Sequence, residues 1–494
     1  MSAEFRPAFG FARRRGVTVA GRDTDGRIRV LVREPADLDA VREVRRHLDG
    51  EVVLERLDPD DYLERIASLY QADEAGARLV ADGVGEQLDL GRLAEELPPS
   101  ADLLESEDDA PIIRLLNGIL AEAVRERASD IHLEPFEDRL AVRFRVDGLL
   151  REVLTTSPLL APLVASRIKV MARLDIAEKR LPQDGRIGLR LAGRAVDVRV
   201  STLPSQHGER IVLRILDKQA GCLSLEQLGM REQQLAAMRG LVHRPHGIVL
   251  VTGPTGSGKS TTLYAALLEL NDRSRNILTI EDPVEYDIDG IGQTQVNPKV
   301  ELDFARGLRA ILRQDPDVVM VGEIRDAETA RIAVQASMTG HLVLSTLHTN
   351  TAIGAVSRLV DMGIEAFLLS GSLTGLIAQR LLRRLDPTRC EPYELGRDEL
   401  ESLGLSVDTA SPVRLHRPRS DLDDPNAAYA GRIGIFEVNA VGNELRRAIH
   451  DRVGEAELER IARQASPSLI EDGWARVCEG LTSLDELLRV ARED

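Results

Sequence analysis

The segment GPTGSGKSTT, from Gly253 to Thr262, has the spacing G-x-x-x-x-G-K-[ST]. Glycines allow backbone N–H groups to curve around phosphate oxygens without obstruction from a Cβ atom. This spacing assigns Lys259 to the β- and γ-phosphates of a nucleotide, and the hydroxyl of Ser260 to Mg²⁺. The segment therefore predicts a phosphate-binding loop made of Gly253, Pro254, Thr255, Gly256, Ser257, Gly258, Lys259, Ser260 and Thr261.

The residues on either side of this loop supply the expected structural context. An apolar run from Ile248 to Val251 predicts a buried strand before it, and the apolar positions from Leu263 to Leu270 predict a helix after it. Such a helix turns the positive end of its dipole toward a bound anion. A glycine-rich turn with an incidental lysine is the alternative, and the strand and helix argue against it.

Carboxylates follow two further apolar runs. In DPDVVMVGEIRD, Glu323 comes after the run Val318 to Val321, and a generic P-loop enzyme would carry Asp at the position of Gly322. We therefore expect Glu323 to support Mg²⁺, directly or through water, or to orient the attacking water. The segment ILTIEDPVEY offers three more acids that could polarise this water, and the residues alone do not choose among Glu281, Asp282 and Glu285. Each of the three could equally be a capping or solvated acid.

Two histidines, His341 and His348, bracket the apolar run HLVLSTLH. We expect the strand to end early enough to leave Thr346 to His348 in the following loop, a place that suits a γ-phosphate sensor. A lone histidine is often structural, so both interpretations stay open. No metal-ligand spacing links the two residues.

The four apolar runs around these residues share one arrangement: each is short and continuous, ends in glycine or polar residues, and is separated from the next by helical stretches. They are IVLVTG, NILTIED, DVVMVGE and HLVLSTLH. This pattern is typical of buried parallel strands, whose carboxyl ends carry the ligand site of an open α/β sheet. The sequence therefore predicts an α/β domain in residues 231–384.

The part before this domain has a different pattern. Ile113, Leu116, Leu120 and Val124 fall on one face of an expected helix that starts at Ala110. Alternating strands follow in RLAVRFRVDGLLREV, RIGLRLAGRAVDVRVSTLP and ERIVLRIL, which predicts a small α+β domain over 110–217 and a hinge over 218–230. Residues 1–97 show helix-like patterning between 36 and 57, and the paired prolines and acidic run of 98–109 predict a linker.

Composition narrows the classes of function. At ~150 residues per domain, 494 residues suggest about three domains. The net charge of −17 argues against a general nucleic-acid binder, although a local basic patch remains possible, and 3% aromatic residues argue against base-stacking platforms. No run approaches the ~20 apolar residues of a membrane span, and the opening residues lack the apolar core of a secretory signal. Three scattered cysteines, Cys222, Cys390 and Cys478, indicate a reducing compartment, so we expect a cytoplasmic protein.

Four motifs together carry a family resemblance. GPTGSGKST, TIEDPVEY, LRQDPDVVMVGEIRD and GHLVLSTLHTN resemble those of the secretion-ATPase superfamily, the P-loop motors of type II secretion, type IV pili and type IV secretion. Upstream, ASDIHLEPFEDRLAVRFRVDGLLREV and LPQDGRIGLRLAGRAVDVRVSTLPSQHGERIVLRILDKQ resemble the type II secretion ATPases, the GspE family. The opening FRPAFGFARRRGVTV is similar to that family's first domain. The resemblance covers nearly the whole chain.

The resemblance implies an α/β fold in which a RecA-like P-loop motor domain (231–384) is preceded by a PAS-like α+β domain (110–217). It also implies a small, mainly helical N-terminal domain (1–97) that binds a recruiter, and a C-terminal lobe (385–494). The implied ligands are ATP and Mg²⁺, and the implied assembly is a homohexamer.

Several site residues are implied in the same way. Glu285 and Glu323 match the acidic-box and Walker B glutamates, and His341 and His348 match the histidine box. Arginines complete the nucleotide site in such motors because a guanidinium neutralises charge on the transferring phosphoryl group. The positions that match are Arg199, Arg214, Arg325 and Arg358, with Arg309 and Arg313 as further candidates.

One departure from the family concerns zinc. Related proteins carry two C-x-x-C pairs after the motor core, a tetrahedral zinc site. Here Asp386 and Arg389 stand at the first pair, Asp421 and Asp424 at the second, and Cys390 is one position out of register. We therefore predict no structural zinc, and a lobe held by packing or salt bridges.

The expected function is an ATP-hydrolysing motor that powers pseudopilus assembly and protein export in type II secretion. The resemblance implies two partners, the cytoplasmic domain of the inner-membrane recruiter GspL and the platform protein GspF, and hence peripheral association with the inner membrane. A type IV pilus extension ATPase is the alternative. A nucleic-acid motor is a second alternative, which the charge argues against. A non-hydrolysing scaffold is a third, which the intact set of Lys259, Glu285 and Glu323 argues against.

Overall fold

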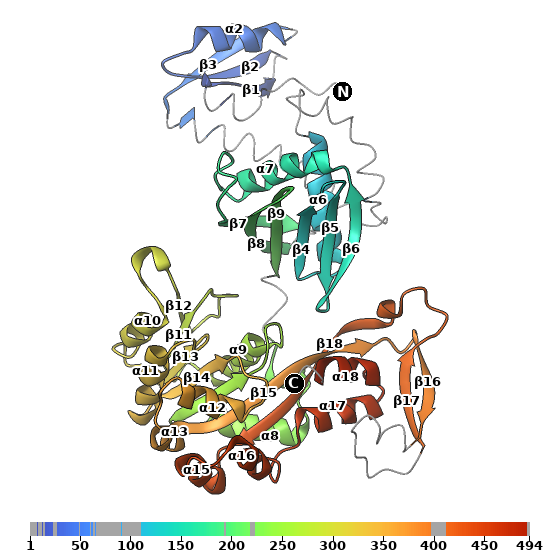
Figure 1. Cartoon of the computed structure of the whole chain (residues 1–494). Helices are drawn as coiled ribbons and strands as arrows, with labels where there is room; N and C mark the ends of the chain where they lie inside the picture. Colours follow the sequence, from blue (N-terminus) through green and yellow to red (C-terminus); the bar gives the residue numbers. More distant parts are fainter. Residues whose placement is uncertain are drawn as a thin grey trace. The chain divides into compact units, whose positions relative to one another are not determined.

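The computed structural model describes residues 110–191, 194–217, 223–396 and 412–491, together with 15–22, 27–48, 50–59 and a few further positions up to residue 90. The chain divides into two compact units, one built mainly from residues up to 215 and the other mainly from residues 216–494. Figure 1 labels the helices and strands along the chain. Within the described ranges, no helix is both long and apolar enough to cross a bilayer.

The first small sheet has the strand order β1-β2-β3, in which β1 and β2 are antiparallel and β2 and β3 are parallel. Its elements are β1 (Val17–Arg22), β2 (Ile28–Arg33), α2 (Leu38–Arg46) and β3 (Val52–Leu57). Helix α2 packs on the sheet because Ala40 and Val44 join a core with alternate residues of the strands, such as Val30 and Val32.

This sheet differs from the expected mainly helical N-terminal domain. Within 1–97, the described residues form three strands besides helix α2, and the helical pattern proposed for 36–57 splits into α2 and β3. The apolar residues of β1 and β2 alternate with a period of two, which is the signal of a half-buried strand. The remaining residues of 1–97 and the predicted linker at 98–109 lie outside the described residues.

The second sheet has six strands in the order β6-β5-β4-β9-β8-β7. Its region contains α6 (Ala110–Arg125), β4 (Asp130–Pro135), β5 (Leu140–Val146), β6 (Leu149–Thr156), α7 (Ala161–Met171), β7 (Gln183–Leu191), β8 (Arg194–Ser205) and β9 (Gly208–Asp217). The three alternating segments predicted as strands are confirmed, and β4 was missed. Of the predicted hinge, residues 218–222 are not described, and Leu225–Leu228 forms a 3₁₀ helix.

The predicted helix at Ala110 is also confirmed, but its buried face differs from the expected one. Leu116 and Leu120 are buried as expected, whereas Ile113 and Val124 are only half-buried. The buried side chains instead recur at the spacing of a helical stripe, at Ile112, Leu115, Leu116, Ile119, Leu120 and Ala123.

The third sheet has seven strands in the order β12-β11-β13-β14-β10-β15-β18. All neighbouring pairs are parallel except β15 and β18. Its strands are β10 (Gly247–Thr252), β11 (Ile277–Glu281), β12 (Gly292–Gln295), β13 (Val318–Val321), β14 (Leu342–Leu347), β15 (Leu373–Leu385) and β18 (Tyr429–Ala440). The predicted parallel strands are confirmed, and their parallel pairing places their carboxyl ends at one edge of the sheet.

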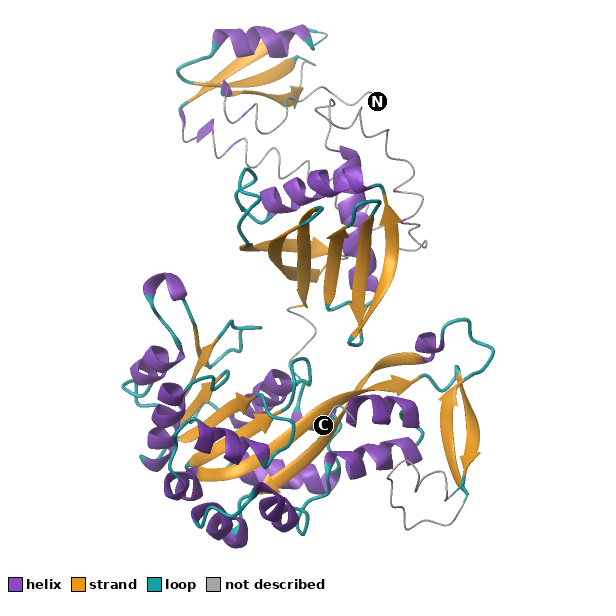
Figure 2. Ribbon diagram, in the orientation of Figure 1, coloured by secondary structure: helices purple, strands orange, loops and turns teal. Residues whose placement is uncertain are grey.

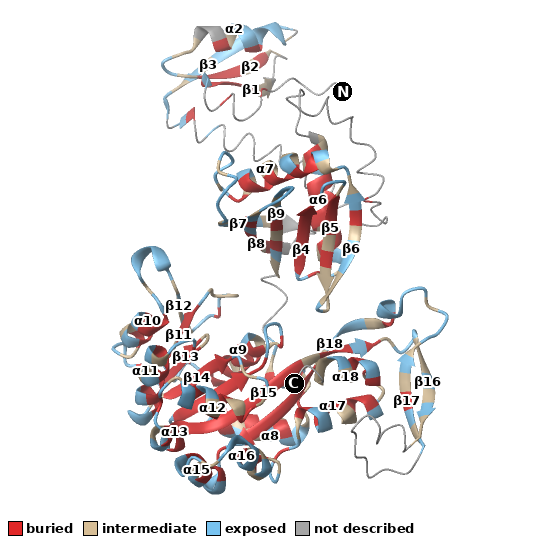
Figure 3. Ribbon diagram, in the orientation of Figure 1, coloured by how far each residue is buried: buried red, intermediate tan, exposed pale blue. Residues whose placement is uncertain are grey.

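Helices cover both faces of this sheet (Figure 2). Ile248 and Leu250 of β10 belong to one buried core, and Val249 and Val251 belong to another. Alternating side chains therefore fill two layers, and the central strands are buried throughout (Figure 3). The helices between the strands are α8 (Glu232–Val242), α9 (Lys259–Leu270), α10 (Phe304–Ile311), α11 (Ala327–Met338), α12 (Gly354–Asp361) and α13 (Ala366–Ser372).

The residues after β15 remain part of this sheet, because β18 pairs with β15 from Gly375↔Ala440 to Leu385↔Tyr429. A separate pair of antiparallel strands, β16 (Cys390–Leu395) and β17 (Val413–Pro418), lies between them in sequence. The described part of the lobe also contains the helices α15 (Asn443–His450), α16 (Glu455–Ala462), α17 (Leu469–Cys478) and α18 (Leu484–Ala491).

A buried ion pair fastens α18 to β15. The Arg383 guanidinium donates from Nε and Nη2 to Oε2 of Glu486, at 3.0 and 2.8 Å, and its Cζ lies 4.0 Å from the ring centroid of Tyr429. Arg489 also donates to both oxygens of Glu486, whose side chain is fully buried. Burial raises the pKa of Glu486, but the hydrogen bonds from Arg489 and Arg383 outweigh burial, so the pKa lies below its ordinary value. The carboxylate is therefore charged at neutral pH.

We expect Glu486→Gln to destabilise the C-terminal lobe by about 3 kcal/mol at neutral pH, because the buried guanidinium of Arg383 and the more exposed one of Arg489 lose their counter-charge. Because the pKa of Glu486 is lower in the folded protein, its carboxylate stabilises the fold above the ordinary pKa of 4.5, and this stabilisation is lost as the pH falls through the folded-state pKa. The difference in unfolding free energy between the unsubstituted protein and Glu486→Gln should therefore shrink in acid. Urea unfolding followed by the fluorescence of Trp474, the single tryptophan, measures this. Glu457→Gln, which breaks the exposed pair with Arg460, is the control and should change nothing measurable.

Candidate active site

The loop from Gly253 to Gly258 connects β10 to α9, and three of its residues need a backbone that glycine adopts readily. Gly253, Gly256 and Gly258 have φ values of 145°, 83° and 87°. A Cβ on Gly253 would lie 2.6 Å from both the carbonyl oxygen of Gln379 and Oγ of Ser257. The loop therefore packs tightly against β15 while its backbone turns into α9, which begins at Lys259.

The loop has the features of an anion cradle. Oγ of Ser257 is buried and has no hydrogen-bond partner within the part of the chain that the structure describes. A buried hydroxyl of this kind is costly to leave unpaired, and a phosphate oxygen would accept a hydrogen bond from it. Ser260 is exposed in the first turn of α9 and Thr261 follows it half-buried, so a hydroxyl is available beside the loop for Mg²⁺. The residues fit the nucleotide and ion that the sequence predicts.

Lys259 is folded back onto the loop, where Nζ donates to the carbonyl oxygens of Gly253 and Pro254 at 2.8 and 2.9 Å. Its side chain is largely buried. Burial lowers the pKa of Lys259 to about 8, with Glu323 opposing this shift and Arg380 adding to it. The charge of this ammonium group therefore depends on pH in the range where enzymes work.

Glu323 lies just beyond the end of β13, with its side chain 16% exposed. Oε1 accepts from Nη2 of Arg325 at 2.5 Å, and Oε2 lies 3.3 Å from Nε2 of His348. Burial raises the pKa of Glu323, but the hydrogen bond and charge of Arg325, together with His348, bring it below its ordinary value. The structure thus brings together three of the predicted site residues, and the carboxylate among them is ionised.

The three acids after β11 have different environments. Glu281 is buried and accepts hydrogen bonds from Tyr264, from Thr279 at 2.5 Å and from Gln293 at 3.2 Å. Asp282 is exposed, and Glu285 is half-buried in the turn that follows. Because three donors within the protein already occupy Glu281, it is the least suited of the three to accept a proton from water, and the choice of Glu285 over Asp282 stays a prediction from the family resemblance.

The two histidines lie at opposite ends of one strand. Thr346 and Leu347 belong to β14, contrary to the expected early end of that strand, and only His348 follows it. The hydroxyl of Thr346 donates to the carbonyl of Gly322 at 2.7 Å, which keeps the strand paired to its last residue. His341 precedes β14, where Nδ1 lies 2.9 Å from the carbonyl oxygen of Ala336. The structure therefore does not bring His341 to the edge that carries His348 and Glu323.

The remaining arginine candidates lie on several elements. Arg199 on β8 is half-buried and Arg214 on β9 is exposed, and both strands belong to the six-stranded sheet. Arg358 is exposed on α12, and Arg309 on α10 pairs with Glu328. Arg313 donates to the carbonyl oxygen of Arg309 at 2.8 Å. The structure thus supports Arg325 through its contact with Glu323, and the roles of the other arginines stay predictions.

Two residues beside the loop were missed by the sequence reasoning. Oε1 of Gln379 on β15 accepts from the hydroxyl of Thr262 at 2.7 Å, which fixes the first turns of α9. The buried Arg380 donates to the carbonyl oxygen of Asn350 at 2.9 Å. A glutamine and an arginine inside an apolar strand are unusual, and this was the signal that could have identified them.

The described residues contain no cluster of three or more His, Cys, Asp or Glu side chains arranged to hold a metal. At the positions of the family's cysteine pairs, Arg389 donates to the carbonyl oxygen of Ala427 at 2.9 Å, and the amide of Arg419 donates to the carbonyl of Arg389 at 3.1 Å. The two turns are therefore joined by hydrogen bonds. The absence of zinc stays a prediction.

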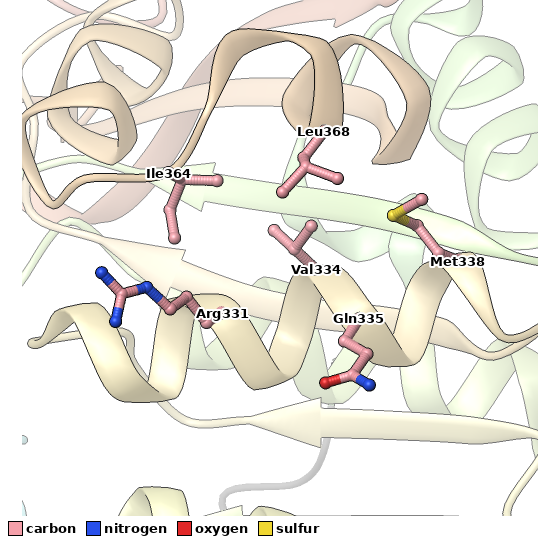
Figure 4. A pocket seen from close by; sticks show the side chains of 6 residues that line it. All are labelled: Arg331, Val334, Gln335, Met338, Ile364 and Leu368. Atoms are coloured by element: carbon pink, nitrogen blue, oxygen red, sulfur yellow. The ribbon is translucent and has the colours of Figure 1, made fainter.

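A shallow apolar pocket lies away from these residues, between α11 and α13 (Figure 4). None of the predicted site residues lines it. Its walls are formed by Arg331, Val334, Gln335, Met338, Ile364 and Leu368.

Comparison with known proteins gives consistent matches. Residues 105–489 match the family described as Type II/IV secretion system protein, and residues 6–70 match a second family, a domain of GSPII protein E. The Type II secretion system protein E of Pseudomonas aeruginosa is 58% identical over 489 residues, which cover 99% of this chain and 97% of that protein. The Type II secretion system ATPase E of Vibrio cholerae is 54% identical over 489 residues, with the same coverage, 99% and 97%.

Solved structures show the same mixed α/β fold. The pilus retraction motor PilT, solved with bound ADP, is 27% identical with a TM-score of 0.52, and the match covers 76% of this chain and 96% of that one. The ATPase DotB of Legionella pneumophila is 22% identical with a TM-score of 0.58, covering 77% and 96%, which shows the fold alone. Together with the sequence matches, these findings show that the chain belongs to the type II secretion ATPases of the type II/IV secretion system protein family.

Proposed function

We propose that this chain is the ATP-hydrolysing motor of a type II secretion system, which powers pseudopilus assembly and protein export. The proposal rests on one observation. A phosphate-binding loop with three glycines of positive φ, and the contacting residues Glu323, Arg325 and His348, all follow the carboxyl ends of parallel strands of one sheet. Lys259 and the loop amides hold the phosphates, and Glu285 accepts the proton of the attacking water. The match to a chain named Type II secretion system ATPase E supports the same assignment.

Mg²⁺ would be held by Ser260 and Glu323, and it supplies charge neutralisation on the phosphate oxygens. The ionised state of Glu323 suits this role, since a cation is bound by a carboxylate and not by a carboxylic acid. His348 lies against the same carboxylate and would sense the phosphate end of the nucleotide. His341 belongs to the same motif but lies at the other end of β14, so we propose a supporting role for it.

The active assembly in this proposal is a homohexamer, with a RecA-like motor domain at 231–384 preceded by a PAS-like domain at 110–217. Arg199 and Arg214 of the latter, with Arg325 of the former, would neutralise charge on the transferring phosphoryl group. In this proposal residues 218–230 would act as the hinge that lets the two domains close over the nucleotide, and the lobe at 385–494 follows the motor domain. Closure would couple hydrolysis to domain rotation.

The proposed partners are the cytoplasmic domain of GspL, bound through residues 1–97, and the platform protein GspF. The match of residues 6–70 to a domain of GSPII protein E supports the first assignment. These contacts would hold a cytoplasmic protein peripherally at the inner membrane. We propose no role in binding nucleic acid.

Two substitutions separate binding from chemistry. Lys259→Ala should abolish nucleotide binding and hydrolysis together, because it removes the cation that the loop presents to the phosphates. Glu285→Gln should lower kcat by about 100-fold or more while leaving nucleotide affinity unchanged, because it removes only the proton acceptor. Calorimetric titration with a nucleotide and Mg²⁺, combined with phosphate release, measures both. Full ATP affinity in Lys259→Ala would refute the cradle assignment.

Nucleotide binding should take up a proton in alkaline solution. A bound phosphate raises the pKa of Lys259, which is about 8 in the free protein, so affinity is full below pH 8 and declines as the pH rises through it. Titration at about pH 9 in two buffers of different ionisation enthalpy should show uptake approaching one proton. Lys259→Arg, whose side chain stays charged, is the control and should show none. Equal uptake in both proteins would assign the proton to another group.

Specific activity should rise with protein concentration, since the proposed arginines lie on separate domains and closure within an oligomer completes the site. Turnover measured across a dilution series, with mass determined by light scattering at each concentration, tests this. Rapid hydrolysis by a species shown to be monomeric would contradict the proposed assembly.

A further inference from the structure

Tyr264 is a buried polar residue that none of the roles above uses. It lies on α9, the helix that begins at Lys259, and it is 1% exposed. Its ring packs against that of Tyr286, with ring centroids 4.7 Å apart. A phenolic hydroxyl at this depth needs hydrogen-bond partners, and the identity of those partners shows what the residue does.

The hydroxyl of Tyr264 joins two different segments. It donates to Oε2 of Glu281, at the end of β11, and accepts from the backbone amide of Glu285 at 3.1 Å. Burial raises the pKa of Tyr264, and the charge of Glu281 raises it further, so the hydroxyl keeps its proton throughout the working range of pH. The direction of both hydrogen bonds is therefore fixed.

The other donors to Glu281 lie on β11 and β12. Oε1 of Glu281 accepts from the hydroxyl of Thr279 at 2.5 Å and from Nε2 of Gln293 at 3.2 Å. Gln293 also accepts from the amide of Ile288 at 2.7 Å, which holds the far end of the turn. Among these contacts, only the one from Tyr264 connects the helix of the phosphate-binding loop to the backbone of Glu285.

We propose that Tyr264 is a positioning residue. Its hydroxyl, anchored to the buried Glu281, holds the turn that carries Glu285 at a fixed position relative to the phosphate-binding loop. This inference rests on the proposed function, because the position of Glu285 affects the rate of hydrolysis only if Glu285 is the proton acceptor. Lys259 and Tyr264 belong to one rigid helix, so the cation that holds the phosphates and the hydroxyl that holds the base are fixed relative to each other. Displacement of a base by about 1 Å can cost about 100-fold in rate.

The test compares two conservative substitutions in the full-length protein. Tyr264→Phe removes the hydroxyl and keeps the buried ring, and Thr279→Val removes a different donor to the same carboxylate. If positioning is the role, Tyr264→Phe lowers kcat by about 10- to 100-fold with KM for ATP within about twofold, whereas Thr279→Val leaves kcat within about threefold. Tyr264→Phe removes two buried hydrogen bonds and Thr279→Val removes one, so Tyr264→Phe should unfold at the lower temperature, and kcat is compared at a temperature where both variants are folded.

A second measurement is independent of catalysis. Amide hydrogen exchange at Glu285 should accelerate by about tenfold in Tyr264→Phe, where its acceptor is lost, and should be unchanged in Thr279→Val. Unchanged exchange in Tyr264→Phe, or equal loss of kcat in the two variants, would overturn the inference.

The outcome for Glu285→Gln separates this inference from the proposed function. Loss of hydrolysis in Glu285→Gln with full activity in Tyr264→Phe would overturn the positioning role and leave the proposed function standing. Full hydrolysis in Glu285→Gln would overturn the assigned base itself, whatever Tyr264→Phe does.

Discussion

The parallel pairing of β10, β11, β13 and β14 is the constraint on which the candidate site depends. Because these strands run in one direction and in register, the phosphate-binding loop, the acidic turn after β11 and Glu323 after β13 emerge at the same edge of the sheet. Parallel sheets are stable only when both faces are covered, and the two buried cores meet that requirement. Residues separated by about seventy positions in sequence can therefore act on one small ligand.

Much of this arrangement could be predicted from the sequence, because its signals are local. The glycines that adopt positive φ, the apolar runs of the strands and the acids that follow them are all properties of short segments. The apolar run from Val318 to Val321 was sufficient to predict that Glu323 follows the end of a strand. The contacts of Glu323 follow from position, because Arg325 lies two residues further along the same segment and His348 comes directly after the neighbouring strand β14.

What could not be predicted depends on contacts between distant segments. Periodicity does not say which of Glu281, Asp282 and Glu285 is buried, because that choice is made by Tyr264 and Gln293 on other elements. The end of β14 was placed too early because Ser345 and Thr346, near its end, are polar. In the structure the hydroxyl of Thr346 donates a hydrogen bond to the carbonyl oxygen of Gly322. The small N-terminal sheet was missed because the helical pattern proposed for 36–57 covers β3, and β1 and β2 lie before it without a motif that marks them.

The position of β15 shows how the C-terminal lobe is attached to the seven-stranded sheet. Gln379 of this strand accepts a hydrogen bond from Thr262 on α9, the helix that follows the phosphate-binding loop. A few residues later, Arg383 of the same strand donates to the buried Glu486 of α18. Since β18 pairs with β15 along most of its length, the lobe extends the same sheet and is not a separate appendage. The two turns near β16 and β17 are joined by a hydrogen bond from the Arg389 guanidinium to the carbonyl oxygen of Ala427 and by one from the amide of Arg419 to the carbonyl oxygen of Arg389. The stability of the lobe is thus supplied by β15, whose opposite flank pairs with the strand that leads into the phosphate-binding loop.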